Sequence, residues 1–427
     1  MANIVQRGNT FTIKVFVGRD ANNKQKFETV TYKPEAKTAA KIKKEVDAYA
    51  AMFEDQVKNG KYRSGNKITF AEYYQTWMKD WAVDNITLGT MEGYKRVIEK
   101  YFLPVLKDKK IASIRVGDIQ TIIDSRKTKV KTVTLKHMLT SVNSVFRYAY
   151  DMDVIDENPC DRVRFARERR KTYNDIHFFT IEQCKTFLNL LDHGFKHDYG
   201  CRTRYKKDGT AYSIAAYQAE VQISEQWKSF FYLAVYGGFR RGEIVALTWN
   251  DIDFTEHTVS INKAAANTKA RGQIIKDTKT ASSERVIKLP KVCFEVLAAW
   301  KTEQKSLAMK LGSAWQGYRG NEYDNNFVFI QMDNGLNMCL DAPSHKFREV
   351  LTYYNDSCEK EEDKLPVIKL HDLRHTSVTQ LLAAGVDIET VSHRHGHSNA
   401  SVTMDVYGHW TEKTDQTASD MLESLFG

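Results

Sequence analysis

A basic stretch near the middle of the chain constrains the fold more than any other feature. It follows Asn158-Pro159, a dipeptide that ends helices because proline lacks an N–H group and disfavours a helical conformation in the residue before it. It contains only two acidic side chains, Asp161 and Glu168. Its cationic side chains are Arg162, Arg164, Arg167, Arg169, Arg170 and Lys171. We expect an exposed linker whose charge suits a phosphate backbone. Since one domain has roughly 100–200 residues, the 427 residues of the chain predict two or three domains.

The first domain, residues 1–66, is predicted to contain a small sheet and one helix. Apolar and polar side chains alternate from Phe11 to Val17, as in a half-buried strand, and residues 26–32 are predicted to pair with it. A helical pattern follows at residues 35–58. The domain contains 13 Lys and Arg against 7 Asp and Glu, a net charge of +6. Two interpretations stay open: a small solvated domain, or a DNA-binding arm whose sheet has a basic face that fits a major groove.

Residues 67–166 are predicted to form an all-helical domain. Thr69 and Glu72 have the spacing of a capping box, which starts a helix. One face of this helix carries aromatic side chains that we expect in the core rather than on a ligand: Phe70, Tyr73, Tyr74, Trp77 and Trp81. Further helical patterns cover Thr87 to Phe102, Arg115 to Ser125 and Val133 to Asp151.

Residues 167–427 are predicted to form the third domain, with 167–174 as its linker. Residues 193–224 are polar, and we expect them to be irregular apart from a hairpin turn at Asp208-Gly209. The other predicted elements are a helix from the Thr180–Gln183 cap to about Leu191, a buried helix at 226–236, strands within 257–289 with turns near Asn267 and Ser282, and mostly helix thereafter.

The composition favours an intracellular protein that binds polyanions. The formal net charge is +9, which biases a globular protein toward nucleic acid. The six cysteines are scattered without a CxxC pair, so we expect a reducing compartment rather than disulfides or a cysteine-zinc site. The N-terminus lacks the apolar core of a signal peptide. The longest apolar run, Phe230 to Phe239, is about half of the roughly 20 residues that a membrane span needs. We therefore expect a soluble, intracellular protein.

Four short segments of the third domain contain residues suited to one reaction. They are 238–243 (GFRRGE), 278–280 (TKT) ahead of a strand, 371–375 (HDLRH), and 395–397 (HGH), which Tyr407 follows ten residues later. Each is unspecific alone, since arginines at helix junctions usually face solvent, lysines in turns are commonplace, and Tyr407 is one of 21 tyrosines. Their combination is what predicts a function.

Cleaving a phosphodiester without a metal requires a nucleophile, cations on the non-bridging oxygens, a base and an acid. Tyr407 is the candidate nucleophile, and its phenol needs help because its ordinary pKa is about 10. The other candidates are Arg240 and Arg374 for the phosphate oxygens, His371 as the base, Lys279 as the acid for the leaving 5′-oxygen, and His397 as a further donor to the phosphate. These roles require neither a metal nor another cofactor.

The order of these residues resembles that in the tyrosine recombinases of phages and conjugative transposons, the lambda integrase family. FRRGEIVALTW and LHDLRHTSVT resemble the family's two arginine boxes, TKTASSERVIKLP its β-hairpin lysine segment, and HGHSNASVTMDVYGH the box that ends in the nucleophile. The resemblance implies a supporting acidic role for Glu243 and catalytic roles for Arg240, Lys279, His371, Arg374, His397 and Tyr407.

The resemblance also implies the fold and the activity. The expected fold is multidomain: a small α+β arm-binding domain, an all-α core-DNA-binding domain, and a mainly helical catalytic domain with a small β-sheet. The expected enzyme integrates and excises a mobile DNA element through a 3′-phosphotyrosyl intermediate, in the bacterial cytoplasm at the nucleoid. Two features depart from the family pattern: His395 stands where a leucine usually precedes Gly-His, and residues 193–224 are longer than usual.

The expected partner is double-stranded DNA at core and arm attachment sites. Joining two duplexes takes four cleavages, so a homotetramer on DNA is expected, with accessory excision or DNA-bending proteins as further candidate partners and no membrane. The tail carries an apolar stripe that we expect to dock on a neighbouring protomer: Ala418, Met421, Leu422, Leu425 and Phe426.

Three alternatives stay open. A zinc site would use His371 and His375 together with some of His393, His395 and His397, although the first pair lacks the intervening glutamate of a zinc protease and no cysteine completes a set. A type IB topoisomerase would share the nucleophile chemistry but does not require an arm domain. A non-enzymatic DNA-binding protein would need only the first two domains.

Overall fold

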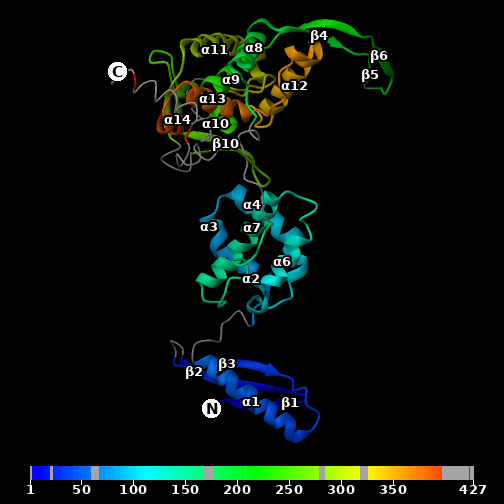
Figure 1. Cartoon of the computed structure of the whole chain (residues 1–427), viewed down its shortest axis with the longest axis vertical. Helices are drawn as coiled ribbons and strands as arrows, with labels where there is room; N and C mark the ends of the chain where they lie inside the picture. Colours follow the sequence, from blue (N-terminus) through cyan, green and yellow to red (C-terminus); the bar gives the residue numbers. More distant parts are fainter. Residues whose placement is uncertain are drawn as a thin grey trace. The chain divides into compact units, whose positions relative to one another are not determined.

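The computed structural model describes residues 2–19, 23–58, 67–166, 177–206, 208–277, 284–317 and 326–396, together with Glu423. The chain divides into two compact units, Met1–Glu168 and Arg169–Gly427 (Figure 1). Most of the predicted linker, the turn near Ser282 and the apolar stripe of the tail lie outside the described residues. The first unit contains two separate hydrophobic cores, and the division into three domains stays a prediction.

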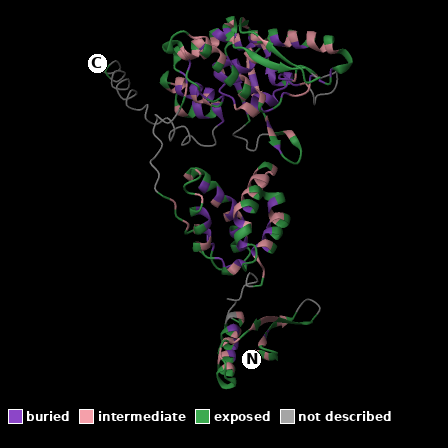
Figure 2. Cartoon of the chain, turned by 90° about the vertical axis from the view of Figure 1, so that its right-hand side faces the viewer, coloured by how far each residue is buried: buried purple, intermediate pink, exposed green. Residues whose placement is uncertain are grey.

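The N-terminal part is a three-stranded antiparallel sheet with one helix on it. The strands have the order β1-β2-β3, and they and the helix have these bounds: β1 (Asn3–Arg7), β2 (Thr10–Arg19), β3 (Gln25–Tyr32) and α1 (Ala39–Lys58). The helix and two of the strands were predicted, and β1 is an addition. Ile13 and Val15 on β2 are buried against Ala50 and Phe53 on α1. This core is small, as the few buried residues of this part show in Figure 2.

The open face of this sheet carries three cationic side chains and no acidic one among the described residues. Directly opposite residues of antiparallel strands point to the same side, so Lys14 shares its face with Asn3 and Thr29, and Phe16 shares it with Phe27. Arg7 lies opposite Thr10 and Arg19 lies opposite Gln25, so both arginines share this face with Lys14. The other described side chains of the face are polar or apolar: Asn3, Val5, Thr10, Thr12, Phe16, Gln25, Phe27, Thr29 and Thr31. Both interpretations of this domain, a small solvated domain or a DNA-binding arm, therefore stay open.

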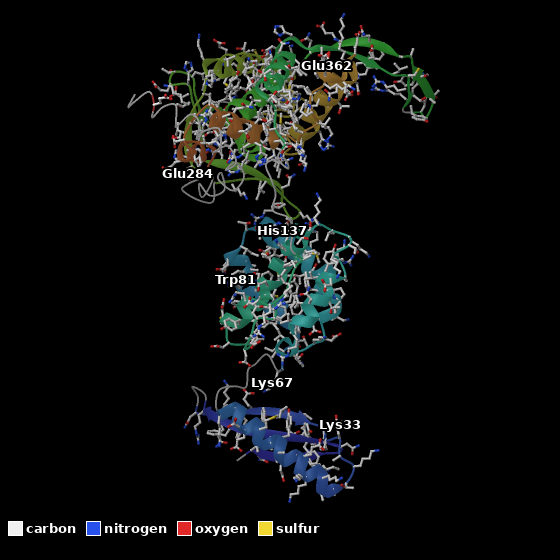
Figure 3. All side chains as sticks on the ribbon, viewed as in Figure 1. Lys33, Lys67, Trp81, His137, Glu284 and Glu362 are labelled. Carbon is white, nitrogen blue, oxygen red and sulfur yellow. The ribbon has the colours of Figure 1, made fainter. Side chains whose placement is uncertain are left out.

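The remainder of the first unit is helical, as predicted. Its helices are α2 (Phe70–Trp77), α3 (Val83–Asn85), α4 (Leu88–Val97), α5 (Leu103–Leu106), α6 (Val116–Asp124) and α7 (Thr132–Asp151), with π-helical turns at Met78–Ala82 and Ile98–Phe102. The capping box is confirmed, since the backbone N–H of Thr69 donates to the carboxylate of Glu72 at 2.7 Å. The predicted aromatic face is core: four of its side chains are buried, and the half-buried Trp81, labelled in Figure 3, stacks on Trp77.

The second unit packs its helices around a central apolar one. The helices are α8 (Ile181–His193), α9 (Glu225–Tyr236), α10 (Arg241–Ala246), α11 (Lys291–Leu311), α12 (Ala342–Ser357), α13 (Asp372–Ala383) and α14 (Ile388–His395). α9 is the predicted buried helix, and its Phe230, Phe231 and Leu233 are each 0% exposed. It contacts both α11 and α13, and α13 in turn contacts α14.

Two small sheets border this helical core. One has the order β12-β9-β8, with bounds β8 (Ile252–Asp253), β9 (Thr258–Ile261) and β12 (Arg285–Lys288), and the other pairs β10 (Lys263–Thr268) with β11 (Gly272–Asp277). β10 contacts α10, and β12 contacts α14. These strands therefore connect the region after the first arginine box with the last described helix.

The prediction that residues 193–224 are irregular is wrong. They form a β-ribbon in which β4 (Phe195–Tyr199) pairs with β7 (Tyr217–Val221) and β5 (Arg202–Tyr205) with β6 (Ala211–Ile214), projecting beside α12 in Figure 1. His197 stacks on Tyr353 of α12 with ring centroids 4.2 Å apart. The hairpin turn is confirmed, since the carboxylate of Asp208 accepts the N–H of Thr210 at 2.9 Å.

Candidate active site

The loop between α9 and α10 places Arg240. Gly238 has a φ of +58°, and a Cβ there would lie 2.3 Å from Nε2 of His395, so the loop needs glycine both for its backbone and for space. The loop brings Arg240 to the N-cap of α10, where 40% of its side chain is exposed.

Glu243 on α10 is 3% exposed and binds two arginines. Its carboxylate accepts the backbone N–H and the guanidinium of Arg240, each at 2.8 Å. It also accepts Nη2 of Arg285 from β12 at 2.8 Å and Nη1 at 3.3 Å. Burial alone would raise the pKa of Glu243, but the hydrogen bonds and charge of Arg285, followed by those of Arg240, lower it below its ordinary value. Glu243 is therefore a buried carboxylate held ionised between two guanidinium groups.

The start of α13 supplies His371 and Arg374. His371 is the N-cap residue and stays exposed, whereas Arg374 is 3% exposed. Arg374 donates from Nη1 to the carbonyl of Gly238 at 2.9 Å and from Nη2 to the carbonyl of His395. It therefore joins the loop before α10 to the end of α14.

Three consecutive carbonyls at the end of α14 each accept a hydrogen bond from a different arginine. The carbonyl groups that end a helix lack intrahelical donors and carry the negative end of the helix dipole, so cations are favourable there. The pairs are Arg285 Nε with Arg394 O at 2.9 Å, Arg374 Nη2 with His395 O, and Arg240 Nη2 with Gly396 O at 2.8 Å. We call these three arginines and Glu243 the arginine network.

The environment of His371 favours its neutral form. Partial desolvation lowers its pKa most, and the positive charge of Arg374 lowers it further. Asp372 raises it, Arg240 lowers it and Glu243 raises it by smaller amounts, which leaves the pKa below the ordinary value of 6.5. An imidazole in this state can accept a proton at neutral pH.

A cleft of about 600 Å³ opens beside His371. Its lining includes the cationic side chains of Arg241, Arg348 and Lys369, of which the last two are exposed. An anionic chain that enters this cleft would meet positive charge next to the candidate base.

The structure brings together four of the sequence-predicted site residues and leaves three undescribed. Arg240, Glu243, His371 and Arg374 lie in or beside the arginine network. Lys279, His397 and Tyr407 lie outside the described residues. In the sequence, His397 directly follows Gly396, whose carbonyl binds Arg240.

Sequence reasoning missed Arg285. The side chains of β12 alternate between buried and exposed, and Arg285 is buried on the same side as Ile287. A charged residue at an inward position of an alternating strand is a detectable signal, because such a charge requires a buried partner. Its carboxylate partner lies 42 positions earlier in the sequence, which no local pattern reveals.

The described residues give a zinc site no support. No group of three or more His, Cys, Asp or Glu side chains among them is arranged to hold a metal ion. The ring of His395 is 0% exposed, with Nδ1 at 2.8 Å from the carbonyl of Val391 and Nε2 at 3.2 Å from the hydroxyl of Ser377. Within the described ranges, no helix is long and apolar enough to span a membrane.

Sequence comparisons find recombinases. The family model described as the phage integrase family matches residues 211–414, and that of the phage integrase N-terminal SAM-like domain matches residues 69–125. The ICEBs1 integrase of Bacillus subtilis (strain 168) is 25% identical over 393 residues, which cover 90% of this chain and 91% of that protein. A transposase from transposon Tn916 of Enterococcus faecalis is 28% identical over 178 residues, which cover 41% of this chain and 40% of that protein.

The same fold occurs in solved structures. The Tn1549 transposon integrase in complex with transposon right end DNA superposes with a TM-score of 0.62 at 20% identity, covering 83% of this chain and 100% of that chain. The complex of this integrase with a circular intermediate DNA gives a TM-score of 0.61 at the same identity and coverage. With both family models matched and relatives aligned along most of its length, the chain belongs to the phage integrase family of tyrosine recombinases.

Proposed function

We propose that this chain is a site-specific recombinase that integrates and excises a mobile DNA element through a covalent bond between Tyr407 and a 3′-phosphate. The observation that carries the proposal is the meeting of Arg240 and Arg374 on the carbonyls of residues 395 and 396, directly ahead of the segment that contains His397 and Tyr407. The guanidinium groups of Arg240 and Arg374 are thus bound to the backbone immediately before the segment that contains the nucleophile.

The proposed reaction is a metal-free phosphoryl transfer. The phenolic oxygen of Tyr407 attacks phosphorus and its proton passes to His371, while the bond to the 5′-oxygen breaks and Lys279 protonates that oxygen. The products are a 3′-phosphotyrosyl bond and a free 5′-hydroxyl. The reverse reaction with a 5′-hydroxyl from another strand rejoins the DNA. Arg240, Arg374 and His397 bind the non-bridging oxygens.

The charge of the arginine network suits this reaction. Among its four side chains, three guanidinium groups oppose the single carboxylate of Glu243, which leaves a surplus of two positive charges. A phosphodiester carries one negative charge, and its five-coordinate transition state carries about two. The network therefore stabilises the transition state more than the bound substrate, which is the condition for catalysis. Because arginines provide this charge, cleavage should persist in EDTA and without ATP.

The proposed partner is double-stranded DNA. The helical domain and the catalytic domain would bind core sites, residues 1–66 would bind arm sites, and four protomers would assemble on two duplexes, with the tail of each on a neighbour. Accessory excision or DNA-bending proteins are the further proposed partners. A chain that starts near Asn66 should keep core-site cleavage and lose arm-site affinity. An unchanged footprint over the whole attachment region would exclude a separate arm function.

The central experiment uses Tyr407→Phe on a nicked DNA substrate that traps the covalent product. The variant should bind DNA normally and trap no adduct, because phenylalanine has no oxygen to attack phosphorus. Tyr354→Phe is the matched control, since the hydroxyl of Tyr354 donates to the carbonyl of Asp363 at 3.3 Å, outside the arginine network. An adduct formed by Tyr407→Phe would contradict the assignment. A four-strand recombination assay then separates a recombinase from a topoisomerase.

A further inference from the structure

Arg285 is the one arginine of the arginine network to which the proposed reaction assigns no contact with the phosphate. Its side chain is 0% exposed, and each of its three guanidinium nitrogens contacts Glu243 or the carbonyl of Arg394. It binds two separate elements at once. Its terminal nitrogens contact both oxygens of Glu243, and its Nε donates to the carbonyl of Arg394 at 2.9 Å. A buried guanidinium with this many fixed contacts holds the groups that it binds in a fixed geometry.

One of the groups that Arg285 holds in place is the end of α14. Gly396 ends the helix with a φ of +61°, and a Cβ there would lie 3.0 Å from Nη1 of Arg285. Arg285 thus binds the carbonyl of Arg394 and fills the space next to Gly396 that a side chain there would need, while Glu243 connects it to Arg240. The chain leaves this point toward His397 and Tyr407.

We propose that Arg285 is a positioning residue for the cleavage step, which fixes the end of α14 relative to the Arg240–Glu243 pair so that the nucleophile's segment starts from a set position. This inference rests on the proposed function. Arg285 acts on the placement of the nucleophile and the phosphate-binding arginine, with little effect on DNA affinity.

A lysine cannot replace the guanidinium in this role. A lysine at position 285 would keep the positive charge that Glu243 needs but presents a single ammonium in place of a rigid fork. It cannot hold both carboxylate oxygens and the Arg394 carbonyl in the same geometry. Arg285→Lys therefore separates charge compensation, which it retains, from positioning, which it loses.

The rival route runs through Lys279. β12 begins at Arg285, and the candidate acid precedes it by six positions in the sequence. A substrate with sulfur in place of the bridging 5′-oxygen distinguishes the two routes. A thiolate leaves without needing a proton, because thiols are far more acidic than alcohols. Such a substrate bypasses a misplaced acid and does not bypass a misplaced nucleophile.

The experiment measures DNA affinity, melting temperature and single-turnover cleavage of both substrates for Arg285→Lys and Arg285→Met in the full-length chain. Lys263→Met is the matched control, because it breaks a different ion pair, the partly buried one with Asp251 at 2.8 Å, which belongs to β10 rather than to the end of α14. We expect Arg285→Lys to melt near the wild type, to bind DNA within about threefold, and to cleave about 100-fold more slowly, as when one preorganised donor is removed. The sulfur substrate should not restore the rate.

Three results would overturn the inference: wild-type cleavage by Arg285→Lys, restoration by the sulfur substrate, or cleavage losses that simply follow melting temperature across all three variants. If Arg285→Met does not fold, Arg285→Lys alone carries the test. Tyr407→Phe is run in parallel. An adduct in Tyr407→Phe refutes the proposed function, whereas normal cleavage by Arg285→Lys with no adduct in Tyr407→Phe refutes this inference alone.

Discussion

The N-terminal sheet and the arginine network both carry excess positive charge, but they hold it in opposite ways. Lys14 on the sheet is exposed, as are Arg7 and Arg19 near the strand ends. In the network, Arg285 has a side chain that is 0% exposed and Arg374 is 3% exposed. Exposed charges act through a screened field and are nearly interchangeable, whereas buried charges act through fixed hydrogen bonds. The difference predicts that a charge-preserving Arg-to-Lys or Lys-to-Arg substitution impairs function in the arginine network and has little effect on the sheet.

The largest expected effect is that of Arg240→Lys, which preserves charge and removes the fork. Lysine cannot bind Glu243 and the Gly396 carbonyl while also reaching a phosphate, so single-turnover cleavage should fall about 100- to 1000-fold. Lys228→Arg is the matched control. This swap preserves charge in a pair with Glu225 at 3.3 Å outside the network, and it should cleave within about twofold of the wild type. Equal rates for both variants would show that charge alone matters.

Glu243→Gln should have the next largest effect, and this effect is on the folding stability of the protein rather than on the cleavage rate. Removing the carboxylate leaves Arg285 buried with uncompensated charge, so urea unfolding should show a loss of about 3 kcal/mol. Glu349→Gln, in a partly exposed pair with Lys346, should cost less than about 1 kcal/mol. Because the pKa of Glu243 is lowered from 4.5, its contribution is complete above that pH and is lost as the pH falls through the folded pKa. The two proteins should therefore converge in stability below pH 4.5.

The pH dependence of cleavage sharpens the comparison further. Since the pKa of His371 is lowered from 6.5, the neutral base dominates at pH 7, and the rate should hold down to pH 6.5. Below the pKa of His371 it should fall by about tenfold per pH unit. Arm-site affinity should change little over the same range, because lysines stay charged. A rate that already falls above pH 6.5 would contradict the role of His371 as the base.

The smallest effect is expected on the sheet. If Lys14 contacts one phosphate, Lys14→Gln should weaken arm-site binding by less than about tenfold at roughly 0.1 M salt and reduce the slope of log affinity against log salt by about 1. Lys14→Arg should bind like the wild type, unlike the corresponding swap at Arg240. Lys43→Gln on the exposed side of α1 is the control. An unchanged slope in Lys14→Gln would remove the open face from the arm interface.

Local sequence patterns determined most of the secondary structure and the candidate residues. The Thr69–Glu72 capping box and the apolar run of α9 depend on neighbours within a few positions, so periodicity was sufficient to find them. The β-ribbon was missed because it has little apolar alternation. Its stability depends on contacts such as that of His197 with Tyr353, 156 positions away.

The arginine network is where tertiary structure decided what the sequence left open. The order of Arg240, Glu243, His371 and Arg374 along the chain indicated a reaction, but the partners of these side chains are largely backbone carbonyls. Every residue has a carbonyl, so nothing in the sequence marks those of Arg394, His395 and Gly396 as ligands for guanidinium groups. They became ligands only because the fold ends α14 beside β12 and α10, with its negative dipole end toward three arginines.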